Sequence, residues 1–224
     1  MHRPIAPHVF VITKKLKKEF KDFAHYNKEN PLDELVFILC SVKRSEKVYR
    51  NAFETLKRVF PKYERLTDTP VGKLSRVIAW GGLQNQKATA VKAIIRTLIK
   101  RFGKPTLAPL KRMSDKECER FLSSLPGVGK KVARCVMLYS LNRQVFPVDT
   151  HCWRIANRLG WNKKTYTSKK YTDKDMDFLQ ELIPPAIRFS LHVNMVSHGR
   201  KICTARSPKC TACAITRYCS KIGL

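Results

Sequence analysis

The stretch Leu125-Pro126-Gly127-Val128-Gly129-Lys130-Lys131 decides the fold of this chain. A helix is expected to begin at Lys130, directly after the two glycines, because apolar residues follow at the spacing of one helical face. These residues are Val132, Cys135, Val136 and Tyr139. The segment before Leu125 should also be helical, since Ser114 and Glu117 have the spacing of a capping box. The stretch therefore predicts two helices joined by a glycine-rich hairpin.

The hairpin is a candidate binding site for a phosphate group. Its backbone N–H groups would lie at the N-terminus of a helix, where the helix dipole is positive. The three donors are those of Gly127, Val128 and Gly129. Lys130 adds a positive charge beside them, and Asp149 places a carboxylate at another predicted helix start. We interpret the hairpin as a binding site for the DNA backbone. Lys131 and Asp149 are the candidate catalytic residues.

The charge of the chain also points to nucleic acid. Its 224 residues contain 45 Lys and Arg against 17 Asp and Glu, a net charge of +28. So large a surplus repels itself unless a polyanion offsets it. No apolar run approaches the length that spans a bilayer, and the N-terminus lacks the features of a signal peptide. We therefore expect an intracellular protein that acts with the DNA and has no membrane partner.

Apolar residues at helical spacing recur along nearly the whole chain, whereas alternating strand patterns are scarce, so the predicted fold is all-α. Besides the hairpin helices, we expect helices over residues 9–28, 46–60 and 173–183. Three more should begin at Pro31, at Thr69-Pro70 and at Asp149, and a long one should end at Phe102. A last helix should follow Pro184-Pro185 and end near Gly199. Helix packing should place the first helix beside the last ones.

Four cysteines near the C-terminus have the spacing C-x6-C-x2-C-x5-C and are candidate metal ligands: Cys203, Cys210, Cys213 and Cys219. In a reducing compartment, thiolates so close together suit zinc or an iron–sulfur cluster. The spacing favours a four-iron cluster, because structural zinc generally uses two C-x2-C pairs and only one is present. A bound metal would present Arg206 and Lys209 outward as phosphate contacts, although both could equally be solvated.

Taken together, the hairpin, the Lys131-to-Asp149 spacing of 18 residues and the cysteine pattern resemble the helix-hairpin-helix DNA glycosylases, and among them the endonuclease III type. The resemblance covers about residues 30–220. It implies two helical lobes: a six-helix barrel with the helix-hairpin-helix motif over residues 27–143, and a second lobe formed by residues 1–26 and 144–224. It also implies a [4Fe-4S] cluster in the second lobe.

The resemblance further implies a base-excision-repair DNA glycosylase with AP lyase activity. Lys131 would attack C1′ of a flipped-out nucleotide, form a Schiff base, and then nick the strand by β-elimination. Asp149 would stabilise the positive charge that develops on the sugar. The expected partner is double-stranded DNA with a damaged or modified base, taken to be a pyrimidine, and the expected state is a monomer. The sequence does not identify the base.

Two loops are expected to contact the DNA. Leu83 resembles the family's apolar wedge, which fills the space left by the flipped nucleotide, although an ordinary core leucine is an equal alternative. Lys43 stands where endonuclease III types generally carry glutamine, with Arg44 beside it. A cation cannot accept hydrogen bonds from a base as an amide does, so this departure puts the usual substrate range in doubt.

Two alternative functions remain. The first is a monofunctional mismatch glycosylase that removes adenine, thymine or uracil. The adenine type needs a glutamate early in its barrel, and the matching stretch 36–41 has none. Monofunctional relatives also lack a lysine at the position of Lys131. The second alternative is a non-catalytic DNA-binding protein, which would not need both Lys131 and Asp149. His151 is interpreted as a structural histidine in preference to a proton relay.

Overall fold

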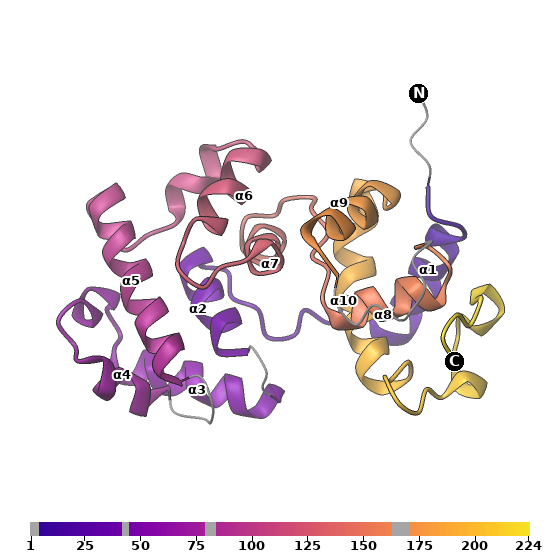
Figure 1. The fold of residues 1–224 in the computed structure, drawn as a ribbon, viewed down its shortest axis with the longest axis horizontal. Coiled ribbons are helices and arrows are strands. Elements are labelled where there is room, and N and C mark those ends of the chain that lie inside the picture. Colours follow the sequence, from indigo (N-terminus) through magenta and orange to yellow (C-terminus); the bar gives the residue numbers. More distant parts are fainter. Residues whose placement is uncertain (1–4, 42–44, 79–83, 163–170) are drawn as a thin grey trace. The chain divides into compact units, whose positions relative to one another are not determined.

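The computed structural model describes residues 5–41, 45–78, 84–162 and 171–224. In these residues all regular secondary structure is helical, as the sequence predicts (Figure 1). The chain divides into two compact units, residues 27–143 and residues 1–26 with 144–224. No helix in the described parts of the chain is both long and apolar enough to cross a membrane.

The unit over residues 27–143 is organised around one buried helix. In its described residues the α-helices are α2 (Pro31–Ser41), α3 (Glu46–Val59), α4 (Val71–Val77), α5 (Gln84–Phe102), α6 (Asp115–Ser123) and α7 (Lys130–Ser140). Two 3-10 helices, η1 (Tyr63–Leu66) and η2 (Ala108–Arg112), lie between them. Helix α2 packs against both α3 and α7, and α4 packs against α5. Because α2 has neighbours on several sides, nearly all of its side chains are buried.

The helix ends in this unit follow local sequence signals. Asn30 Oδ1 accepts hydrogen bonds from the N–H groups of Leu32 (2.9 Å) and Asp33 (3.2 Å), which starts α2. Ser114 and Glu117 form the predicted capping box of α6. Gly103 has a φ of 73° and ends α5, since few other residues adopt that conformation cheaply.

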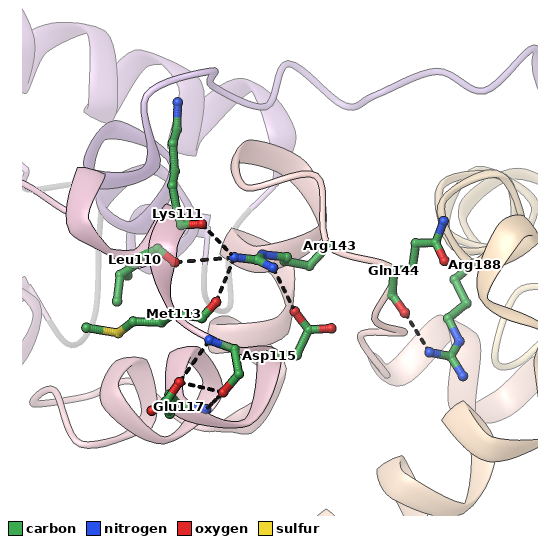
Figure 2. Close-up of polar contacts among 9 residues, drawn as sticks. Leu110, Lys111, Met113, Asp115, Glu117, Arg143, Gln144 and Arg188 are labelled. Atoms are coloured by element: carbon green, nitrogen blue, oxygen red, sulfur yellow. Dashed lines mark hydrogen bonds and ion pairs between the residues drawn. The ribbon is translucent and has the colours of Figure 1, made fainter.

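Arg143, the last residue of this unit, fastens its C-terminal end to the corner between η2 and α6. Figure 2 shows the guanidinium donating to the carbonyl oxygens of Leu110, Lys111 (3.0 Å) and Met113 (2.8 Å). Its Nη1 also lies 3.3 Å from Asp115 Oδ1. One side chain therefore satisfies several carbonyl groups at the end of a short helix.

The other unit joins the two ends of the chain. It contains α1 (Val9–Phe20), α8 (Thr150–Arg158), α9 (Asp173–Leu182) and α10 (Arg188–Lys201), with 3-10 helices η3 (Pro185–Ile187), η4 (Cys210–Ala212) and η5 (Thr216–Tyr218). Helix α10 packs against both α1 and α8, which confirms that the first helix lies beside a late one. Buried apolar side chains fill the space between these helices, among them Ile12, Leu16, Phe146, Ile155, Leu179, Leu191 and Met195.

The predicted helix over residues 9–28 is too long, because α1 ends at Phe20. Lys21 and Asp22 adopt left-handed conformations with φ near 55° and 53°. This bend lets Asp22 Oδ1 accept hydrogen bonds from Ser190 and Asn194 of α10, both at 2.6 Å. Contacts with a distant helix thus override the local helical pattern.

Candidate functional site

The hairpin between α6 and α7 is held by its own backbone. The N–H of Val128 donates a hydrogen bond of 3.1 Å to the Leu125 carbonyl, and this bond closes the turn. The Val128 side chain is buried. Gly127 has a φ of 75°, and a Cβ added there would lie 3.2 Å from Ala90 Cβ. The positive φ strains any residue with a side chain, and the added Cβ would crowd Ala90, so glycine is favoured at this position.

One carboxylate, that of Glu119, ties the two hairpin helices together. Its Oε2 accepts a hydrogen bond of 2.6 Å from Arg134 Nε, and its Oε1 lies 3.6 Å from Lys130 Nζ. The Arg134 side chain is only 3% exposed, so the carboxylate of Glu119 is needed to compensate its buried positive charge. Lys130, predicted as a phosphate contact, is thus ion-paired inside the hairpin. The next cation along the chain is Lys131.

Lys131 lies in the first turn of α7 and is half-buried. It acts electrostatically on Glu34 of α2, whose pKa is raised to about 7 by burial and lowered in part by Lys28 and Lys131. Glu34 has no exposed surface. Sequence reasoning missed this carboxyl, although it directly precedes the apolar stripe that begins at Leu35.

Asp149 is the N-cap of α8, as its position predicted. Its Oδ1 accepts a hydrogen bond of 2.8 Å from the Cys152 N–H, which fixes the carboxylate at the helix start. His151 stands in a structural network, since its Nδ1 lies 3.0 Å from Arg154 Nη2. Burial lowers the pKa of His151, because a charged imidazole would lose its hydration there. Gly199 makes room for this ring: a Cβ there would lie 2.7 Å from His151 Nδ1.

The four C-terminal cysteines line one pocket that is partly open to solvent. All four are free thiols and half-buried: Cys203, Cys210, Cys213 and Cys219. In the described residues no three His, Cys, Asp or Glu side chains converge on a position for a single ion. Four thiols around a shared space match the donor set of an iron–sulfur cluster, which is larger than one ion. The residues therefore fit the cluster that the cysteine spacing favours.

A buried arginine, Arg158, holds the loop between Cys203 and Cys210 in place. Its Nη1 donates to Cys203 Sγ at 3.1 Å and to the Thr204 carbonyl at 2.7 Å, and its Nη2 donates to the Ala205 carbonyl at 3.1 Å. Thr204 Oγ1 closes the loop on the Ser207 carbonyl at 2.7 Å. Sequence reasoning gave this ordering role to the metal alone and missed Arg158, because a buried arginine in a helix has no distinctive sequence signal.

The remaining candidate residues have simple placements. Arg206 and Lys209 are exposed on the ligand loop, as expected. Lys43, Arg44 and Leu83, predicted to contact the DNA, lie outside the described residues. Lys131 belongs to the unit over residues 27–143, whereas Asp149 belongs to the other unit together with the four cysteines.

Known proteins with similar sequences belong to one family of DNA repair proteins. The sequence profile described as "HhH-GPD superfamily base excision DNA repair protein" matches residues 39–184. A protein of Arabidopsis thaliana named as a DNA glycosylase is 36% identical over 176 residues, 79% of this chain. The chain spans only 58% of the length of that relative. Endonuclease III of Buchnera aphidicola subsp. Baizongia pistaciae is 30% identical over 192 residues, which are 83% of this chain and 80% of the relative.

A solved structure shows the same fold. The protein in the "Structure of a non-covalent Endonuclease III-DNA Complex" superposes with a TM-score of 0.81, covering 96% of this chain and 94% of that one. Its sequence identity to this chain is 22%, so the likeness establishes the fold alone.

Proposed function

Because this chain belongs to the HhH-GPD superfamily of base excision DNA repair proteins and resembles endonuclease III, we propose that it is a DNA glycosylase with AP lyase activity. The observation that carries the lyase part is the position of Lys131, half-buried in the first turn of the helix that follows the hairpin. The hairpin backbone binds the DNA strand, and the lysine directly after it is presented to the sugar.

The proposed reaction begins with attack by Lys131 Nζ on C1′ of an extruded nucleotide. The C1′–N bond to the base breaks, and ring opening gives a Schiff base between Lys131 and the sugar. Loss of a proton from C2′ then expels the 3′ phosphate, which nicks the strand. Asp149 carries the negative charge that stabilises the cationic sugar, and its role as N-cap keeps the carboxylate in place.

We further propose that unit 27–143 corresponds to the family's barrel lobe and that the other unit corresponds to its cluster lobe. The pocket lined by the four cysteines would hold a [4Fe-4S] cluster through Cys203, Cys210, Cys213 and Cys219. Such a cluster supplies structural cross-linking, redox chemistry, or both. Iron and acid-labile sulfide in anaerobically purified protein test this assignment. About four of each per chain would support it, whereas one zinc without sulfide would contradict it.

The proposed substrate is double-stranded DNA that contains a damaged or modified pyrimidine, bound by a monomer. A panel of duplexes with one lesion each tests the substrate, and an abasic-site duplex tests the lyase step separately. Release of a pyrimidine lesion with strand cleavage is the expected result. Base release without cleavage would favour the monofunctional alternative, and neither activity would favour a DNA-binding protein without catalysis.

A further inference from the structure

A buried histidine, His198, contacts one of the four cysteines that line the pocket. His198 lies in the last turn of α10 and is 1% exposed. Nε2 of its ring lies 3.6 Å from Cys213 Sγ. This separation suits a hydrogen bond to sulfur, whose radius is larger than that of oxygen. Nδ1 of the same ring is buried and has no hydrogen-bond partner among the described residues.

The surroundings of the two ring nitrogens decide which of them carries the proton. A neutral imidazole has one N–H donor and one acceptor nitrogen. A proton on Nδ1 of His198 would be a buried donor without an acceptor, which costs free energy. A proton on Nε2 faces Cys213 Sγ, and a cysteine that binds a metal is a thiolate, which accepts hydrogen bonds. The arrangement therefore favours donation from Nε2 to the Cys213 sulfur.

The other contacts of His198 involve its backbone and the shape of its ring. Its carbonyl oxygen accepts hydrogen bonds from the N–H groups of Ile202 (2.8 Å) and Cys203 (2.9 Å). The imidazole meets the Phe20 ring edge to face, with the centroids 5.9 Å apart. A phenylalanine in place of His198 would keep the backbone bonds and the aromatic contact, and would lose the ring nitrogens. Packing alone therefore does not explain the N–H group of His198.

Other donors to the cysteine sulfurs are harder to isolate by substitution. Arg158 Nη1 donates to Cys203 Sγ at 3.1 Å, but the same side chain also donates to two backbone carbonyl groups. Cys213 also accepts a hydrogen bond from the backbone N–H of Ile215, which a change of side chain does not remove. The contact of His198 with Cys213 can be removed without disturbing either of these.

We propose that His198 is a positioning residue for the [4Fe-4S] cluster: its Nε2–H group donates to the Cys213 thiolate and thereby raises the reduction potential of the cluster. This inference rests on the proposed cluster in the pocket. The reduced form of a cluster with four thiolate ligands carries one more negative charge than the oxidised form. A hydrogen bond to a ligand sulfur strengthens as the sulfur gains electron density, so it stabilises the reduced form more.

The test is the midpoint potential of the protein with its cluster, measured by anaerobic titration with dithionite and followed by EPR. Wild type is compared with His198→Phe and His198→Gln. Phenylalanine keeps the ring without a donor, whereas glutamine offers an amide N–H at a similar distance from the backbone. We expect a lower midpoint potential for His198→Phe and a value close to wild type for His198→Gln. The Fe–S stretching frequencies in resonance Raman spectra should rise in His198→Phe alone, because the Fe–S bond strengthens when the hydrogen bond is lost.

His192→Phe is the matched control. His192 lies on the same helix and is also buried. Its Nδ1 lies 3.4 Å from Cys152 Sγ, and Cys152 is not one of the four proposed ligands. The same substitution therefore removes a histidine–cysteine contact away from the cluster, and the midpoint potential should equal that of wild type.

The outcomes separate this proposal from the proposed cluster. Iron and acid-labile sulfide are measured first, and a wild type without them would overturn both. If the cluster is present and His198→Phe keeps the wild-type potential, the role of His198 alone is overturned. Equal shifts in His198→Phe and His198→Gln, or an equal shift in His192→Phe, would be an effect of packing and would also overturn it. Loss of the cluster from either His198 variant would assign the side chain a structural role, with the same consequence.

Discussion

At the scale of the residue, position rather than type distinguishes Lys131. The chain has 45 lysines and arginines, so residue type alone does not single out one lysine. Lys131 combines half-burial, the first turn of α7 and an electrostatic link to the buried Glu34. The resemblance indicated the lysine from sequence. Glu34 could not be predicted in the same way, because its burial depends on how α7 packs on α2.

Asp149 combines two roles that substitution can separate. Asparagine is as good an N-cap as aspartate, so Asp149→Asn should keep the bond to the Cys152 N–H and change the free energy of unfolding by only a few tenths of a kcal/mol. Base excision should nevertheless fall by about 100-fold or more, because the negative charge is lost. Asp149→Ala should lose a further 1 kcal/mol or so of stability. Thermal melts and single-turnover rates check both, and an active Asn variant would contradict the assignment.

Glu34 should make stability depend on pH. Its folded-state pKa of about 7 lies above the ordinary value of 4.5, so the folded chain binds a proton that the unfolded chain has released. The free energy of unfolding should therefore fall as the pH rises from about 4.5 to 7, by up to about 3 kcal/mol. Glu34→Gln cannot ionise and should be more stable than the wild type at pH 8, but similar at pH 4.5. Denaturant unfolding at both pH values measures this, and parallel curves would contradict it.

At the scale of the element, local signals predicted helix starts well and long-range contacts less well. The helix start predicted at Pro31 and the capping box predicted at Ser114 depend on side chains two or three residues from their partners, and both are confirmed. The predicted end of the first helix, at residue 28, was wrong. Helix α1 ends at Phe20, because Asp22 bonds to α10, far along the chain. Likewise, the contacts of Arg158 with the cysteine loop exist only after α8 meets the C-terminal segment.

The hairpin offers a test with an internal control. Gly127→Ala should destabilise the protein by about 1–2 kcal/mol and weaken DNA binding, since alanine is strained at a φ of 75° and its Cβ would crowd Ala90. Gly72→Ala places the same methyl group in α4, where nothing lies within 4 Å. That variant should be neutral or more stable by up to about 1 kcal/mol. Chemical denaturation and duplex affinity measure both, and equal effects of the two changes would contradict the account of the turn.

At the scale of the whole molecule, composition and pattern predicted the all-α fold, and the structure confirms it in the described residues. Helical spacing sufficed for this, because it is repeated in nearly every segment. The meeting of the chain ends, through the packing of α1 on α10, was expected only in outline. The DNA contacts expected from two loops, with Lys43, Arg44 and Leu83, stay predictions.

The net charge of +28 predicts strong dependence of DNA binding on salt. Cations released from the phosphates drive association, so affinity for an undamaged duplex should fall about 1,000-fold or more between 50 and 200 mM salt if at least six phosphates are contacted. Fluorescence anisotropy at several salt concentrations gives the slope. A fall of less than tenfold would indicate that the positive surface serves another purpose.

The central claim is that Lys131 forms a covalent bond with the sugar. The most direct measurement is borohydride trapping on an abasic-site duplex, with wild type, Lys131→Gln and the neighbouring Lys130→Gln run side by side. The account predicts a protein–DNA adduct and strand nicking with the wild type and with Lys130→Gln. With Lys131→Gln it predicts neither, although the duplex is still bound. An adduct that persists in Lys131→Gln would contradict the account.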